Sequence, residues 1–587
     1  MTKHGIEALL EALQRALTPA IAREAAFFSP APPVMRLITT GAEGADLLGM
    51  RAANKRAVKI SCVIPFAREE YRSDFSPAAA AVAADLLSRT ETLLELPGQR
   101  AEGPRAFERA NDIVLSNIDV LVAVWDGGRA HGRAGTGDVV QAAVDSGIPV
   151  LVIDPAAPGT ASLLAAPHAE EIEPPVASDL GRKPPPADLT EFVHTLVSPL
   201  PKRVQRQGLK DLVAETPRSA DWRFEYPLLL KTLARRPNIR RTFAAATGAP
   251  EKTAPPVDEA ALSAASANSK RLENVEHARE IIDGLAVQYG RRFRSSSVSQ
   301  YLIVILGTWL SGLIGLLIPK LATASIGVQL LASALVLADA AFRARRRWQE
   351  RWLDYRVVAE RLRWLGFRYS FGLGPGRRVQ SAAPRRKSWA DWYLVRTAHA
   401  LGPPEGKIDA VSIGAAVDHL TKVEIPQQID YHRVTFRQLG LLERRLSLAA
   451  HGSLLAAVVV AVLFAIAALH AGGMNAVGWR RSAILLLTLL PITMTTLNGL
   501  RVDADLARLV ERSAQTTALL FRARRVMLTA PRDYDHVASN MQWLAAILRG
   551  ELEEWRFVIE SRRSRGGVRP IKQKQGCAAD WTPCGSG

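Results

Sequence analysis

Two glycine-bearing turns in the first quarter of the chain could hold an anionic group. The first turn reads TGAEGADL and contains Gly41 and Gly44. The second reads WDGGRAHGRAGTGDVV, and its candidate ligand-binding residues are Gly127, Gly128, Gly135, Thr136 and Gly137. Glycine lets a backbone approach a phosphate closely, and the free N–H groups at a helix start then face the anion. Neither turn is a complete dinucleotide fingerprint or Walker motif, so ordinary turn chemistry stays open for each.

The elements around these turns alternate between short apolar strands and helices. We expect strands at 34–41, 58–66, 119–127 and 148–155, and helices at 45–55, 78–96, 105–118 and 136–147. Continuous Val/Ile/Leu strands separated by helices predict a parallel sheet covered on both faces. Ligands of such sheets bind beyond the carboxyl ends of the strands, where both turns fall.

The order of these segments resembles the SLOG superfamily over about residues 30–155. The similar stretches are GAEGADLL, VIPFAREEYRSDF, NIDVLVAVWDG and AGTGDVVQAAVDSGIPVLVID. That superfamily comprises Rossmannoid domains related to the LOG nucleotide phosphoribohydrolases, the DprA fold and the cytosolic sensor region of TRPM channels. The resemblance implies an α/β Rossmannoid domain with a nucleotide pocket. Its lining would be Gly41 and Gly44 on one side, a phosphate cradle of Gly135, Thr136 and Gly137, and Phe66 and Arg68 at the rim.

The sequence departs from the catalytic LOG members, which carry a PGGxGTxxE motif. Here GRAGTGDVVQA places Val140 near the position of that glutamate. Hydrolysis of an N-glycosidic bond needs a placed carboxylate, and Glu43, Glu69 and Asp138 are conceivable substitutes. A solvated or helix-capping role is the preferred interpretation of each. We therefore assign no catalytic residue and favour a sensor of a nucleotide or an ADP-ribose derivative, without a cofactor, over a hydrolase.

Two later segments predict membrane-spanning hairpins. Residues 302–319 and 323–342 form the first pair, and 453–469 and 482–500 the second. Each arm has about the ~20 apolar residues needed to cross a bilayer as a helix. A buried helical hairpin of a soluble protein is the alternative, and the second hairpin weakens it.

The positive charge gathers beside these spans. The chain has a formal net charge of +18, and many of its arginines flank apolar segments: Arg291, Arg292, Arg294, Arg343, Arg345, Arg346, Arg347, Arg444, Arg445, Arg480 and Arg481. Anionic lipid headgroups are therefore the expected partner, and nucleic acid is not. The Lys/Arg asymmetry across the first hairpin predicts that both of its outer ends are cytoplasmic. The amphipathic N-terminus lacks the features of a signal peptide, so both termini should be cytoplasmic.

The expected organisation has seven parts. They are an N-terminal helix (1–33), the nucleotide-binding domain (34–155), a linker and helical connector (156–257), a stalk with the first hairpin and a charged helix (258–370), a cytoplasmic helical segment (371–446), the second hairpin with a charged helix (447–560) and a flexible tail (561–587). Two spans followed by a charged helix thus occur twice, which is an architectural repeat.

The second half resembles the SLATT family, two-span domains found beside SLOG sensors in bacterial conflict systems. The stretches RRWQERWLDYRVVAERLRW and ERRLSLAAHGSLLAAVVV are the similar ones. The SLOG–SLATT order implies an antiviral defence effector of the bacterial inner membrane that permeabilises it when a nucleotide signal arrives. Four spans cannot enclose a channel, so we expect a homo-oligomer. The alternatives are a membrane-anchored nucleotide or NAD-metabolite hydrolase and a non-catalytic membrane scaffold.

A few residues within the spans could contribute to a pore. Asp339 is ionisable, and such groups inside a membrane are functional candidates. It also lies four residues before Arg343, so an interfacial i,i+4 pair is the preferred interpretation. The other pore candidates are Pro491, Thr493, Thr496 and Asn498, for which local repair of the proline-interrupted helix is the alternative. Gly307 and Gly312 indicate tight helix packing.

Metal and disulfide chemistry finds no support in the sequence. The eleven histidines are scattered, and the three cysteines, Cys62, Cys577 and Cys584, show neither zinc spacing nor a disulfide framework. Cys62 stands in an apolar run and is expected in the core. His131 lies in the second glycine turn, where a surface-loop position is expected. No metal site is predicted.

Overall fold

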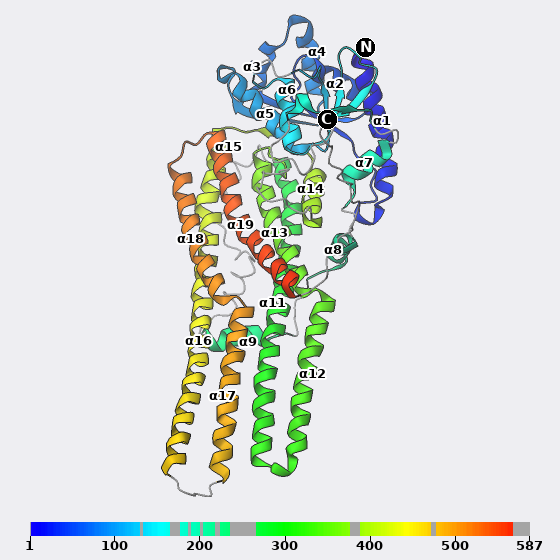
Figure 1. The fold of residues 1–587 in the computed structure, drawn as a ribbon. Helices are drawn as coiled ribbons and strands as arrows, with labels where there is room; N and C mark the ends of the chain where they lie inside the picture. The colour runs from blue at the N-terminus through cyan, green and yellow to red at the C-terminus, as the bar shows by residue number, and fades with distance from the viewer. Residues whose placement is uncertain are drawn as a thin grey trace, which may run out of the picture.

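The computed structural model describes residues 2–128, 133–164, 176–185, 189–199, 203–217, 223–234, 266–375, 388–470 and 477–566. An α/β region built on parallel strands forms the N-terminal part. An all-helical region with four long apolar helices forms the C-terminal part (Figure 1). The predicted fold class is therefore confirmed.

The first sheet is entirely parallel. Its strand order is β1 (Arg36–Thr39), β2 (Lys59–Phe66), β3 (Thr92–Gly98) and β8 (Gly406–Lys407). The helices between its first three strands are α2 (Ala45–Lys55), α3 (Arg68–Tyr71) and α4 (Pro77–Ser88), and α5 (Pro104–Asn117) follows β3. Strand β2 is buried from Ile60 to Phe66 because it is covered on both faces, which explains its unbroken apolar sequence.

A second, mixed sheet follows. Strands β4 (Leu121–Val124) and β5 (Val150–Ile153) are parallel and joined through α6 (Thr136–Asp145). Strands β6 (Ala161–Leu164) and β7 (Arg182–Lys183) add to it in antiparallel fashion. Leu151 and Ile153 belong to the same apolar core as Ile64 of β2, so the two sheets are packed as one region.

The helix expected over 78–96 is wrong in its second half. Helix α4 ends at Ser88, and the residues from Thr92 form β3 between β2 and β8. Thr92, Leu94 and Leu96 are buried while the residues between them are less so, which is the period of a strand. The partner strand β8 comes from the helical half of the chain, so no local pattern could reveal this pairing.

The helical part consists mostly of long helices. They are α11 (Ser266–Leu317), α12 (Ala322–Arg346), α13 (Trp348–Ser370), α14 (Trp389–Leu401), α15 (Ala410–His419), α16 (Ile425–His470), α17 (Val477–Asp503), α18 (Leu506–Thr529) and α19 (Tyr534–Gly566). Helix α11 packs against α12 and α17, and α17 packs against α16. The α11–α12 turn and the adjoining ends of α16 and α17 lie at the end remote from the α/β region (Figure 1).

Four helices of the described residues are long and apolar enough to span a membrane. Their apolar stretches expose large side chains, such as Leu306, Leu337 and Leu463. Exposed leucines along a whole stretch would be costly in water and are favourable in hydrocarbon. A hairpin buried inside a soluble protein does not fit this exposure, so a membrane protein is indicated. The α/β region and α13, α14 and α19 all lie beyond the same end of these stretches (Figure 1).

An apolar core joins the α/β region to the helices. Leu94 of β3 and Ile113 of α5 share this core with Phe371, Met541 and Leu544. Polar contacts surround it: Arg109 of α5 pairs with Asp535 of α19 at 2.8 Å, and Asn117 Nδ2 donates to the Gly372 carbonyl at 2.9 Å. The two parts are therefore docked through a continuous core.

A helical connector runs between the same two parts. It consists of α7 (Leu189–Val197), which packs on α1 (Thr2–Ala22), then α8 (Arg203–Ala214) and α9 (Glu225–Leu233). Helix α8 packs on α14, and α9 reaches the level at which the apolar stretches begin (Figure 1). There α9 contacts both α11 and α16.

The docking core gives the first testable prediction. Gly372 has a φ of +75°, and a Cβ there would lie 2.7 Å from Leu94 Cδ2 and 3.1 Å from Ile113 Cδ1. Gly372→Ala should lower the stability of the full-length protein in detergent by about 1–3 kcal/mol, through backbone strain and overpacking. Thermal unfolding measures this.

The matched control is Gly414→Ala in α15, where no atom lies within 4 Å of the added Cβ. It should keep or slightly raise the stability, because alanine is the better helix former. Equal unfolding temperatures for the two variants would contradict the docking described here.

Candidate ligand site and its polar links to the membrane helices

The first glycine turn follows β1 and has the backbone that its glycines predict. Gly41 and Gly44 have φ values of +71° and +108°, which side chains with a Cβ rarely adopt. The Ala42 N–H donates to Asp46 Oδ2 at 3.3 Å, and the Thr40 hydroxyl donates to the same oxygen at 2.7 Å. Asp46 thus places a carboxylate in the first turn of α2, so this turn suits a hydroxyl or an amine of a ligand better than a phosphate.

Glu43 has a structural partner. Its carboxylate accepts hydrogen bonds from the Ser76 N–H and the Ser76 hydroxyl, both at 2.7 Å. Ser76 precedes α4, so Glu43 ties the first turn to the start of that helix. These hydrogen bonds, the backbone one first, lower the pKa of Glu43 below its ordinary value. Glu43 therefore bonds the residue that precedes α4, which agrees with the preferred helix-capping interpretation.

The two residues expected at the rim differ in their positions. Phe66 is fully buried and packs edge-on against Tyr71 and Phe107, with ring centroids 5.6 and 5.8 Å apart, so its expected rim position is wrong. Arg68 is partly exposed, and its Nε lies 3.6 Å from Glu95. Since β1 and β2 are parallel neighbours, Arg68 supplies a positive charge near the first turn. Glu69 is exposed beside it.

The second turn is packed against an arginine that the sequence did not single out. Gly127 has φ +96°, and a Cβ there would lie 2.5 Å from Arg182 Nη2. The Arg182 guanidinium lies 5.5 Å from the Trp125 ring centroid and pairs with Asp154 at 3.0 Å. The Gly128 N–H donates to Asp126 Oδ1 at 2.8 Å. Gly127 therefore permits the close approach of a cation to the carboxyl end of β4.

The second half of this turn leads into α6. Gly135 caps the helix with an extended backbone, and Thr136 is its first residue. Asp138 is exposed in the first turn, whereas Val140 is fully buried. A buried valine near the position of the LOG glutamate leaves no carboxylate there. His131 lies outside the described residues.

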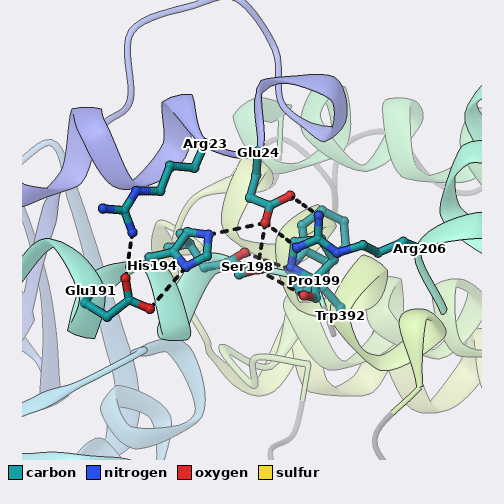
Figure 2. Close-up of polar contacts among 9 residues, drawn as sticks. Arg23, Glu24, Glu191, His194, Ser198, Pro199, Arg206 and Trp392 are labelled. Carbon is teal, nitrogen blue, oxygen red and sulfur yellow. Dashed lines mark hydrogen bonds and ion pairs between the residues drawn. The ribbon is translucent and has the colours of Figure 1, made fainter. Parts of the chain in front are cut away.

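A buried carboxylate joins the α/β region to the connector (Figure 2). The Glu24 side chain, just after α1, is 3% exposed. It accepts hydrogen bonds from Ser198 Oγ at 3.0 Å and from Arg206 Nη1 and Nη2 at 3.0 and 2.5 Å, and it lies 3.2 Å from His194 Nε2. Trp392 of α14 donates to the Val197 carbonyl at 2.8 Å. Residues of α7 and α8 and of the segment between them thus meet at one carboxylate, and α14 is bonded to the end of α7 beside it.

The electrostatics of Glu24 follow from these contacts. Burial raises the pKa of the carboxyl, but the hydrogen bonds from Arg206 and Ser198 and the Arg206 charge outweigh it. The pKa of Glu24 therefore lies below its ordinary value, and the carboxylate stays charged at neutral pH.

A second polar cluster lies where the connector meets the spans. Asp339 of α12 accepts hydrogen bonds from Arg223 of the connector and from Ser296 of α11. Arg343 donates instead to Ser297 Oγ at 3.0 Å, so the expected i,i+4 pair of Asp339 with Arg343 is wrong. Arg223 lies two residues before α9 and is buried. It can pair with Asp339 because α9 packs between the two hairpins.

Helix α9 also binds the second hairpin. Tyr226, Leu229 and Leu233 pack into a core with residues of α11, α16 and α17. Arg445 of α16 donates to the Leu233 carbonyl at 2.6 Å. One short helix therefore contacts both hairpins at their ends nearest the α/β region.

The remaining pore candidates have partners inside the helices. Thr493 and Thr496 donate to the carbonyls four residues earlier, at 2.8 and 2.7 Å, and Asn498 accepts from Arg501 at 2.8 Å. Pro491 lies within the continuous helix α17. The structure thus accounts for these side chains by local satisfaction, and their role in a pore stays a prediction.

Close packing explains the glycines of the first span. A Cβ at Gly307 would lie 2.5 Å from Ala332 of α12, and one at Gly312 would lie 2.6 Å from Leu485 of α17. The tight-packing interpretation is confirmed for both.

Comparison with known proteins gives one family match. The family described as "protein of unknown function (DUF4231)" matches residues 278–382. The matched residues cover most of α11 and all of α12 and α13. No curated protein and no solved structure matches the chain.

The Glu24 cluster gives the second prediction. Glu24→Gln should lower stability at pH 7 by about 1–3 kcal/mol, because it removes a charged acceptor from Arg206. Since the folded pKa of Glu24 lies below the unfolded one, its contribution is complete above the unfolded value and is lost as pH falls through the folded value. The two proteins should therefore converge in stability at acid pH, as measured by thermal unfolding of the full chain from pH 7 to pH 3.

Glu191→Gln is the control, since Glu191 is exposed and pairs with exposed Arg23. It should change stability by less than about 1 kcal/mol. A Glu24→Gln protein as stable as this control at pH 7 would show that the cluster does not hold the connector.

Proposed function

We propose that this chain is a ligand-gated membrane effector. A SLOG-like α/β domain senses a nucleotide-derived ligand and gates a SLATT-like, four-span homo-oligomeric pore, as in bacterial antiviral defence. The observation that carries the proposal is the connector. It is held to the α/β region by the Glu24 cluster and to the spans by the Arg223–Asp339 pair, so both ends of the molecule are joined by buried polar contacts.

The ligand argument rests on the two glycine turns and the cations beside them. Arg68 lies at the carboxyl end of β2, and Arg182 lies against Gly127 at the end of β4. The second turn, with Arg182 beside it, suits a phosphate, whereas the first turn, with Asp46, suits a hydroxyl or an amine of the same ligand. A nucleotide or an ADP-ribose derivative carries both kinds of group. Glu43 is engaged in capping and Val140 is buried, which supports a sensor rather than a hydrolase.

The orientation argument rests on the arginines. At the ends of the spans nearest the α/β region lie Arg291, Arg292, Arg294, Arg343, Arg345, Arg346, Arg444 and Arg445, whereas the described residues at the tips include Lys320, Arg480 and Arg481. This excess supports a cytoplasmic α/β region, cytoplasmic termini and contact with anionic headgroups of the bacterial inner membrane.

The coupling argument requires two states. A ligand shifts an equilibrium only if it binds one state better than the other. Repacking of the α/β region would act on α7 and α8 through Glu24. Helix α9 is the next helix of the connector and would then be displaced as well. Helix α9 contacts both hairpins, so its displacement would change how they pack.

A third prediction tests the ligand site. In a thermal-shift screen against mono-, di- and cyclic nucleotides and ADP-ribose derivatives, one class should stabilise the full chain in detergent. The same ligand should release dye from vesicles that contain the protein. Gly137→Phe should abolish both effects, because a bulky side chain at the start of α6 fills the space of a phosphate. The full chain is needed because β8 completes the first sheet.

Gly159→Phe is the control, since no atom lies within 4 Å of a Cβ at that position. It should retain both responses. A Gly137→Phe protein that still releases dye on ligand addition would contradict the proposal. Release of free base from the ligand would instead support the hydrolase, and the absence of any thermal shift would support the scaffold.

A fourth prediction tests the connector. Breaking a buried ion pair costs about 3 kcal/mol or more, so Arg223→Gln should destabilise the resting arrangement and raise ligand-independent dye release by about a hundredfold. Arg223→Lys should fall between this variant and the wild type, since it keeps the charge but not the planar guanidinium.

Asp339→Asn combined with Arg223→Gln should leak less than Arg223→Gln alone, because no unpaired carboxylate remains. Vesicles with Arg223→Gln that stay tight and still respond to ligand would show that this pair does not control the spans.

A further inference from the structure

Helix α12 carries an amide in the middle of an apolar stretch. Gln329 is the only Gln or Asn in the first hairpin, and it lies seven residues after the start of α12, about 10 Å along the helix. Its side chain is exposed and makes no hydrogen bond within the part of the chain that the structure describes. Ser333, one turn later, is exposed as well.

Most other polar side chains of the apolar stretches have a partner. Trp309 Nε1 donates to Thr493 Oγ1 at 2.9 Å, and Ser311 Oγ donates to the Ser325 carbonyl at 2.8 Å. Thr488 donates to the carbonyl of Ile484 at 2.9 Å. Gln329 differs because its amide has two donors and an acceptor that its own helix cannot satisfy.

The position of α12 explains why its amide lacks a partner within the chain. Helix α12 packs on α11 where Ala332 meets Gly307, and Gln329 lies on an adjacent side of the helix. Leu330, Leu331 and Leu337 are among its exposed residues. Figure 1 shows α12 at the outer edge of the row formed with α11, α17 and α16.

Leaving an amide unpaired in hydrocarbon is costly, because the group loses the hydrogen bonds that it makes with water. Lipid tails offer no hydrogen bond, and a glutamine side chain is too short to reach the headgroups across about two helical turns. A second copy of the same helix offers both a donor and an acceptor at the same depth. Hydrogen bonds between spanning helices of this kind are an established source of association in membranes.

We propose that the side of α12 bearing Gln329 and Ser333 is the contact between two copies of this chain in the membrane. The amides of Gln329 in the two copies pair with each other, and Ser333 lies beside them. This inference names the partner surface of the homo-oligomer in the proposed function, but it requires only that the helices lie in a membrane and not that they form a pore.

The experiment uses the full chain in native membranes, with Cys62, Cys577 and Cys584 replaced by alanine. Gln329→Cys should form a disulfide-linked dimer on oxidation, and Leu331→Cys, on another side of the same helix, should not. In detergent at natural cysteine content, Gln329→Leu should reduce the oligomer fraction at least tenfold, measured by native mass spectrometry. Gln329→Asn should keep part of it.

The combined variant Gln329→Leu and Leu331→Gln moves the amide to a different side and should not restore the oligomer. An oligomer unchanged by Gln329→Leu, together with no cross-link at 329, would overturn the proposal. Rapid modification of Gln329→Cys by a water-soluble thiol reagent would also overturn it, because the side chain would then face water. A Gln329→Leu protein that loses the oligomer but still shifts in the nucleotide screen would separate this surface from the ligand site.

Discussion

The apolar core shared by β3, α5 and the helices α13 and α19 is the constraint on which the rest of the structure depends. It fixes the α/β region against the end of the helices that lies away from the hairpin tips. Because Leu94 and Ile113 lose their cover without Phe371 and its neighbours, neither part is complete by itself. The connector therefore links two parts that are already docked. Its two polar clusters, at Glu24 and at Asp339, can respond to small displacements between those parts.

Much of the fold was predictable because its signals are local. Helix α2 has the predicted bounds, and the length of the apolar stretches predicted the four long helices. Strand β3 was missed because the stretch before it is rich in alanine and leucine, which favour a helix, while its pairing with β2 and with Gly406 and Lys407 of β8 is not local. A partner as distant in the sequence as β8 leaves no signal in the local sequence.

The backbone conformation of the glycine turns was predictable from the sequence, whereas the charged side chains beside them and in the connector were not. Gly41, Gly44 and Gly127 occupy the conformations that glycine turns require. Of the charged groups that matter, Glu24 lies in the predicted N-terminal helical segment, and Arg182 and Arg223 lie in the predicted linker and connector. Each meets its partner across a large separation in the chain, as Arg223 does with Asp339. The sequence instead suggested Arg343 as the partner of Asp339, because an i,i+4 pair within one helix is the kind of ion pair that spacing along the chain can reveal.

The length of α11 has a mechanical consequence. Its 52 residues form one uninterrupted helix from the layer beneath the α/β region to the far tip of the first hairpin. At 1.5 Å per residue the rod is about 78 Å long, so a tilt of about 5° about one end moves the other by about 7 Å. Leverage of this size would let a small adjustment near the pivot become a shift of about 7 Å at the far tip of the hairpin.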